Sequence, residues 1–189
     1  MARGAGVTPS QTVGPFWRIG LPWAASSSFA ADGIPPDAIT ITGHVLDGAG
    51  DPIDDAIVES WQADGDGRFD HPDDPRGAVA WDSFRGFARA CVDDDGRYEI
   101  TTIMPGPVPA ADGTPQAPHL LVSVFARGLL DRVVTRIYFA DHAEAHATDP
   151  VLESVPADRR STLIAQSTEG GYRLDIHLQG PQETVFFAL

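Results

Sequence analysis

The sequence contains no lysine, and its 13 cationic side chains are all arginines, set against 27 acidic ones. The formal net charge is −14. Nucleic-acid binding needs a cationic surface that neutralises phosphates, and anionic membranes attract polybasic segments. We therefore expect neither a nucleic acid nor a membrane as a partner. The field of the whole chain would repel an anionic substrate, so any attraction has to come from a few local positive charges.

Cysteine is almost absent as well. A single residue, Cys91, excludes an internal disulfide and any metal site built from several thiolates. No stretch reaches the ~18 consecutive apolar residues of a membrane span. The first nine residues lack the apolar core of a signal peptide, so a cytoplasmic protein is expected. The length of 189 residues fits one domain with a sizeable core.

Glycine and proline are abundant, with 19 and 16 residues, and they separate short apolar runs. Residues 1–38 have no sustained period and predict an extended N-terminal arm. From residue 39 onward, β-branched and alternating segments predict strands at residues 39–45, 56–61, 84–92, 97–103, 119–126, 133–139, 172–179 and 184–187. One short helix is expected at about 157–166. This pattern predicts an all-β fold, with a single β-sandwich domain at residues 39–189.

Three polar segments carry candidate chemistry. The turn Asp64-Gly65-Asp66-Gly67 has the oxygen-rich start of a calcium loop, but its glycine is misplaced and no helices flank it, so a solvated turn is favoured. His142 and His146 would share one face of a helix, but the glutamate of a zinc-protease motif is misplaced, so a surface turn is favoured. His119 and Leu121 share one face of a predicted strand, and His119 is favoured as a hydrogen-bonded interior residue over a metal ligand.

Several segments together resemble the intradiol ring-cleavage dioxygenases, a family that uses non-haem ferric iron. The most specific are Trp61-Gln62-Ala63-Asp64 and the stretch from Gly96-Arg97-Tyr98 to Met104-Pro105-Gly106, followed by Thr135-Arg136-Ile137-Tyr138-Phe139 and Tyr172-Arg173-Leu174-Asp175-Ile176. The resemblance spans about residues 7–187. The N-terminal Thr8–Phe16 segment and Phe125-Ala126-Arg127-Gly128 resemble the iron-free α subunit of two-chain members.

Members of this family hold iron with two tyrosines and two histidines, and this chain departs from that set. One of the two tyrosines corresponds to Val108, and the two histidines correspond to His119 and Leu121. An arginine that opens the histidine segment in the family corresponds to Gln116. The second tyrosine is missing, because no tyrosine occurs between Tyr98 and Tyr138. One imidazole cannot hold a hard ferric ion, which prefers anionic oxygen donors such as phenolate. The resemblance therefore implies no metal and no catalytic residue on this chain, with Fe(III) in the holoenzyme held by a homologous β subunit.

The same resemblance implies a role beside the partner's iron. The two subunits would pair within a higher αβ oligomer that cleaves protocatechuate with O₂ to 3-carboxy-cis,cis-muconate. The residues of this chain that would line the substrate cavity are Thr12, Pro15, Phe16 and Arg127. Protocatechuate is a catechol with a carboxylate, which the Arg127 guanidinium would orient. A structural ion pair is the alternative for Arg127, and packing of the arm on the partner is the alternative for the other three.

Two other functions stay open on the sequence. One is a self-sufficient intradiol dioxygenase with relocated ligands, which would show ferric–tyrosinate absorption when the chain is purified alone. The other is a non-enzymatic, transthyretin-like binding module, which residues 41–64 would also suit. Failure to co-purify with an iron-bearing homologue would favour the binding module.

Overall fold

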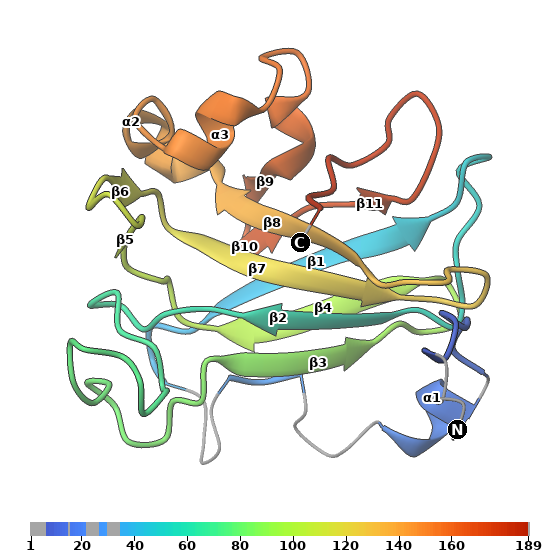
Figure 1. Cartoon of the computed structure of the whole chain (residues 1–189), viewed down its shortest axis with the longest axis horizontal. Helices are drawn as coiled ribbons and strands as arrows, with labels where there is room; N and C mark the ends of the chain where they lie inside the picture. The colour runs from blue at the N-terminus through green and yellow to red at the C-terminus, as the bar shows by residue number, and fades with distance from the viewer. Residues whose placement is uncertain (1–6, 15, 22–26, 30–34, 189) are drawn as a thin grey trace, which may run out of the picture.

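The computed structural model describes residues 7–14, 16–21, 27–29 and 35–188. Within these ranges, nine strands form one sheet that folds over into two layers (Figure 1). They are β1 (Ile39–Leu46), β2 (Ile57–Trp61), β3 (Phe87–Cys91), β4 (Arg97–Thr102), β7 (His119–Phe125), β8 (Val133–Phe139), β9 (Ile164–Thr168), β10 (Gly171–Arg173) and β11 (Ile176–His177). A separate ribbon pairs β5 (Val108–Pro109) with β6 (Pro115–Gln116). The predicted all-β fold is confirmed.

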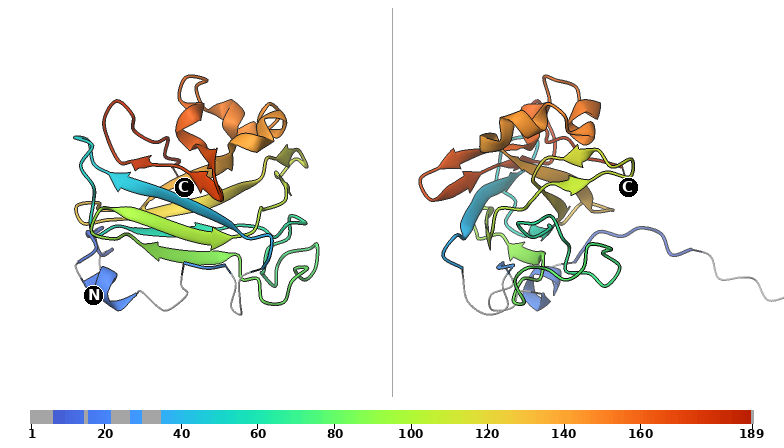
Figure 2. Two further views of the ribbon diagram at one scale, coloured as in Figure 1. Left: turned by 180° about the vertical axis from the view of Figure 1, so that it is seen from behind. Right: turned by 90° about the vertical axis from the view of Figure 1, so that its left-hand side faces the viewer.

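One layer is the antiparallel run β3-β2-β7-β8, and the other is built around β1 and β4. Strand β9 connects them, because it pairs parallel with β8 and antiparallel with β10. Strands β10 and β11 then lie parallel to β1. Figure 2 shows the two layers from behind and edge-on. The core lies between them, where fully buried side chains of β1 and β4 meet those of β2 and β7.

Strand β7 shows why these residues form a half-exposed sheet. Leu120, Val122 and Val124 are fully buried and face the core, whereas Leu121 and Ser123 are half-buried on the outer face. Strict alternation of this kind places every second side chain on the same face. On this strand, the side chains available for contacts outside the core are therefore those on the outer face, which include His119 and Leu121.

The sequence-based expectations are wrong at the C-terminal end. The single strand expected at residues 172–179 is interrupted, because a carboxylate oxygen of Asp175 accepts the His44 N–H at 2.9 Å, an N–H that a continuous strand would have paired. The Leu174 carbonyl accepts the Tyr98 hydroxyl at 2.7 Å instead of extending the ladder. Residues 184–187 form no strand either, although the Phe187 N–H still bonds the Val134 carbonyl.

Helix is scarce and short. The helix expected at 157–166 is wrong: a 3₁₀ turn, η2 (Arg160–Leu163), leads directly into β9. Further helical turns are α2 (Ala143–His146), its preceding 3₁₀ turn η1 (Ala140–His142), and α3 (Pro150–Ser154). The arm also departs from the extended conformation expected, because α1 (Phe16–Gly20) is helical. Among the described residues, no helix combines the length and apolar character needed to cross a membrane.

Candidate functional site

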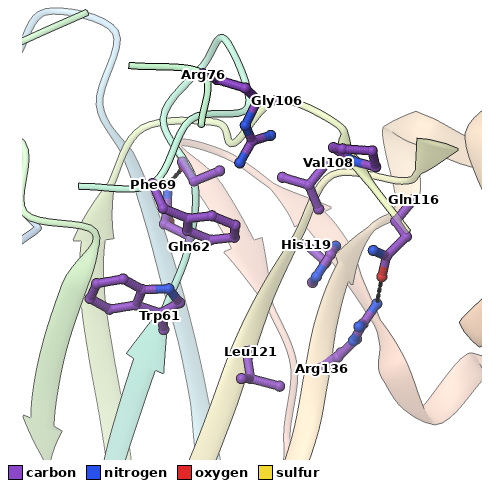
Figure 3. Close-up of a pocket in the computed structure, with 12 residues that line it drawn as sticks. Trp61, Gln62, Phe69, Arg76, Gly106, Val108, Gln116, His119, Leu121 and Arg136 are labelled. Carbon is purple, nitrogen blue, oxygen red and sulfur yellow. Dashed lines mark hydrogen bonds between the residues drawn. The ribbon is translucent and has the colours of Figure 1, made fainter. Parts of the chain in front are cut away.

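A cavity of about 220 Å³ opens on the outer face where β2, β7 and β8 come together (Figure 3). We call it the strand-end cavity. Its lining includes all four positions that the sequence comparison with iron-binding members singled out. These are Val108, Gln116, His119 and Leu121. Strand register adds two more side chains, since Leu121 pairs with Trp61 on β2 and with Arg136 on β8, which places the three in one row on the same face.

One wall of the strand-end cavity is aromatic. The rings of Trp61 and Phe69 are nearly parallel, with centroids 6.1 Å apart and planes 12° apart. The guanidinium of Arg76 lies 5.6 Å from the centre of the Phe69 ring. Both Phe69 and Arg76 come from the irregular segment at residues 64–80, which closes over the end of β2 (Figure 3).

Two buried aspartates hold residues 64–80 in place. Asp64 is only 1% exposed, and its carboxylate accepts backbone N–H bonds from Asp66, Arg68 and Ala80 at 2.8–3.0 Å. Both of its oxygens are thus bonded to the protein's own backbone, so the Asp64 end of this turn is buried and not solvated as expected from the sequence.

The second aspartate, Asp74, forms a bidentate ion pair with Arg76 at 2.7 and 2.8 Å and also accepts the Phe69 N–H. These bonds, led by the one from the Arg76 side chain, hold the pKa of the Asp74 carboxyl well below its usual range. The positive charge of Arg76 is therefore largely neutralised at the rim of the cavity.

His119 is held in one tautomer. Its Nδ1 lies 2.7 Å from the Ala117 carbonyl, which can only accept, so Nδ1 carries the proton and Nε2 is left with a lone pair. Burial, followed by the positive charge of Arg136, lowers the pKa of His119 to about 4. The Ala117 N–H is in turn bound by the buried carboxylate of Asp149 at 2.7 Å. His119 is therefore a neutral, hydrogen-bonded residue at physiological pH, as its lone position on the strand favoured.

Arg136 is the second arginine that lines the strand-end cavity, beside Arg76. Its Nη1 donates to Gln116 Oε1 at 2.8 Å and to the Tyr138 hydroxyl oxygen at 3.0 Å, and the former bond is drawn in Figure 3. The Tyr138 hydroxyl lies 3.4 Å from Asp149. Within the described ranges, no carboxylate is close enough to Arg136 to form an ion pair. The guanidinium is thus oriented by neutral groups and keeps its charge available.

The residues expected to line a partner's cavity lie at the other end of β7. The Thr12 hydroxyl accepts the Gly128 N–H at 2.8 Å, which fixes the arm beside Arg127. Strand β7 lies between His119 at its start and Arg127 just beyond its end, and it is about 20 Å long at ~3.4 Å per residue. Phe16 is 80% exposed on α1, which packs at this end of β7, because the ring centroids of Trp17 on α1 and Phe125 on β7 lie 5.3 Å apart. Figure 1 shows α1 near the end of β7. Pro15 lies outside the described residues.

Arg127 already has acidic partners on this chain. Its side chain is 70% exposed and lies 3.4 Å from Asp54 and 3.1 Å from Asp55. The structural ion pair considered from the sequence is therefore present. Exposed ion pairs of this kind contribute at most about 1 kcal/mol, so they leave the guanidinium able to exchange partners.

Comparison with known proteins decides the family. A family model described as a dioxygenase matches residues 14–180. The chain is 43% identical to the protocatechuate 3,4-dioxygenase alpha chain of Burkholderia cepacia, over 95% of this chain and 96% of that protein. It is 39% identical to the alpha chain from Pseudomonas putida, over 95% of both. The chain belongs to the intradiol dioxygenase family. The resemblance identified from the sequence is thereby confirmed.

Other members of the family are more distant. The beta chain of the Burkholderia cepacia enzyme is 35% identical over 78% of this chain and 67% of that protein. Among solved structures, catechol 1,2-dioxygenase from Acinetobacter sp. ADP1 superimposes with a TM-score of 0.59 at 18% identity, over 79% of this chain and 54% of that one. That structural likeness supports the fold alone.

The family's ferric ion does not fit the residues at the strand-end cavity. Two of the corresponding side chains, Val108 and Leu121, are hydrocarbons, so the Nε2 of His119 is the one donor left at these positions, and it is not anionic. The Arg136 guanidinium adds a positive charge where a trivalent cation would need negative ones. In the described part of the chain, no three His, Cys, Asp or Glu side chains are grouped closely enough to hold a metal ion.

Sequence reasoning missed the groups that now define this cavity. Arg136 has a usable signal in the sequence, because it is the one charge on an otherwise mostly apolar, β-branched strand. Phe69 and Arg76 lie in a segment without strand or helix signals, and nothing local in the sequence assigns them to the wall. Asp149 was not singled out, because its role depends on contact with Ala117, 32 residues earlier.

Proposed function

We propose that this chain is the iron-free α subunit of a protocatechuate 3,4-dioxygenase. The holoenzyme would add both atoms of O₂ to protocatechuate and release 3-carboxy-cis,cis-muconate in the cytoplasm. Fe(III) would be held by a homologous β subunit, and the two chains would assemble into a higher αβ oligomer. The likeness to two alpha chains along nearly the whole length supports the assignment.

The observation that carries the proposal is the donor set of the strand-end cavity. At the family's metal position this chain offers one neutral imidazole, two hydrocarbon side chains and the guanidinium of Arg136. Such a set disfavours a cation, so an active holoenzyme needs the metal on another chain. The β chain relative from Burkholderia cepacia supports a homologous partner.

The arm, at residues 1–38, and the Arg127 end of β7 would form the side facing that partner. The helical turn α1 exposes Phe16 and Ile19 by 80% and 73%, and Val7 is 98% exposed. Exposed apolar side chains gathered on one segment favour burial against another protein. In this proposal Thr12, Pro15, Phe16 and Arg127 line the partner's substrate cavity, about a strand's length from the strand-end cavity of their own chain.

Expression with and without the iron-bearing homologue tests the assignment. Iron content and protocatechuate-dependent O₂ uptake are measured for this chain alone, for the partner alone and for both together. The proposal expects iron and activity with the two chains co-purified, and neither for this chain alone. Iron and O₂ uptake by the chain alone would establish the self-sufficient enzyme, and failure to co-purify would favour the binding module.

The role of Arg127 has its own test in the assembled enzyme. We expect Arg127→Ala to raise the KM for protocatechuate by about tenfold, the value of one charge-assisted hydrogen bond, while the KM for catechol, which lacks the carboxylate, stays within twofold. Arg132→Ala is the matched control, since it removes an exposed arginine from the same connection between β7 and β8. Equal changes in the two KM values would show that Arg127 serves only its ion pair with Asp54 and Asp55.

A further inference from the structure

The strand-end cavity holds an arginine side chain that has no acidic partner among the described residues. The chain carries 27 acidic side chains, yet the Arg136 guanidinium inside the cavity pairs with none of those in the described ranges. Among the described residues, its hydrogen bonds come from Nη1 alone and go to the neutral groups Gln116 and Tyr138, which fix the plane of the guanidinium. An oriented, partly buried guanidinium with unused donors is suited to a carboxylate.

The apolar walls of the cavity favour a ligand whose remaining part is an apolar ring. Trp61 and Phe69 form an aromatic surface on one side, and Leu121 and Val108 provide aliphatic surface on the other (Figure 3). The volume of about 220 Å³ exceeds the apolar cavity of about 150 Å³ that accepts benzene in an engineered protein. One benzene ring with a carboxylate therefore has room.

We propose that the strand-end cavity is a non-catalytic binding site for a planar aromatic monocarboxylate. Arg136 binds the carboxylate through the donors that Gln116 and Tyr138 leave unused, and the ring packs between the aromatic and aliphatic walls. Neutral His119 adds no charge of its own and closes the side of the cavity next to Arg136. The site is separate from the Arg127 end of the chain, and it does not depend on the proposed subunit role.

Binding of 4-fluorobenzoate tests the site in the protein as it is purified, alone or with its partner. Equilibrium dialysis under nitrogen counts the bound ligand per chain, and fluorine NMR follows its environment. In an iron-containing assembly, the visible ferric band is recorded in parallel, so that ligand bound at iron is counted separately. We expect one site per chain that leaves the ferric band unchanged. No such site in the wild-type protein would overturn the proposal.

Two variants of the cavity and one control locate the site. Arg136→Gln should weaken binding at least tenfold, because it removes the charge-assisted bonds to the carboxylate. Leu121→Trp should abolish binding by filling the cavity while leaving Arg136 in place, and it keeps the test valid if the arginine variant is unstable. Arg132→Gln, an exposed arginine just before β8, should bind as the wild type. Wild-type affinity in both cavity variants would refute the assignment.

Competition defines the chemical class. Acetate offers the same carboxylate without a ring, so it should displace 4-fluorobenzoate only at concentrations about 10- to 150-fold higher, because a buried ring contributes roughly 1.5–3 kcal/mol. Displacement by acetate at equal concentration would contradict an aromatic ligand and indicate a general anion site.

Discussion

Asp64 is expected to decide whether the wall of the strand-end cavity forms. Its carboxylate is 1% exposed and accepts three backbone N–H groups, from Asp66, Arg68 and Ala80. In Asp64→Asn, one oxygen still serves two donors, but the new amide faces the third N–H. A hydrogen bond to a charged group contributes about 1.5–3 kcal/mol, so we expect a loss of about 2 kcal/mol in the free energy of unfolding.

Asp64→Ala removes all three acceptors, and water entering the space recovers part of the cost, so a loss of about 4 kcal/mol is expected. For a chain of this length these losses correspond to decreases in Tm of about 4–8 °C and about 8–16 °C.

Urea denaturation followed by circular dichroism gives the free energies, and thermal scans give Tm. The control is Asp66→Asn, whose side chain is 59% exposed and should change stability by less than about 0.5 kcal/mol. The reasoning is refuted if Asp64→Ala unfolds within about 0.5 kcal/mol of the wild type, or if the Asp66 control loses as much.

Three further predictions concern other parts of the fold. Because the folded-state pKa of His119 is about 4 against an ordinary 6.5, its contribution to stability is complete above pH 6.5 and is lost as the pH falls towards 4. Arg136→Gln should raise that pKa in an NMR titration, since a nearby positive charge is removed. Gly106→Ala should cost several kcal/mol, because the new Cβ would lie 2.6 Å from the Gly67 nitrogen. Tyr98→Phe should cost about 1–2 kcal/mol by leaving a buried carbonyl unpaired.

Each of these has a control or an outcome that contradicts it. Arg132→Gln, at an exposed position, should leave the His119 titration unchanged. Gly14→Ala meets no atom within 4 Å and should be nearly neutral in the same denaturation experiment that tests Gly106. Equal stability of the wild type and Tyr98→Phe would show that water replaces the lost bond to Leu174.

The sheet was predictable because local patterns determine it. Strands β7 and β8 alternate or concentrate β-branched residues over their whole length, so their bounds follow from the sequence within one residue. Strand β10 ends early for a non-local reason, since Asp175 supplies a side-chain acceptor to β1, 131 residues away. A competition between side chain and backbone over that separation leaves no local signature.

The candidate site was predictable only in part. Resemblance to a family indicated the positions of Val108, Gln116, His119 and Leu121, and the fold places them around one cavity. The presence of Arg136 in this cavity follows only from strand register, because β8 pairs Arg136 with Leu121. The aromatic wall depended on residues 64–80, whose shape is set by carboxylates binding distant backbone groups.

The pairing of β1 has a consequence for how the chain is made. Strand β1 ends at Leu46, and its parallel neighbours β10 and β11 are synthesised only about 125 residues later, from Gly171 onward. At about 5–20 residues per second, β1 waits roughly 6–25 s for them. Such long-range parallel pairing is slow to form, and unpaired strand edges are prone to aggregation in the meantime. Completion of the second layer, and any assembly that depends on it, therefore waits for β10 and β11, and truncations after β9 should yield insoluble chain.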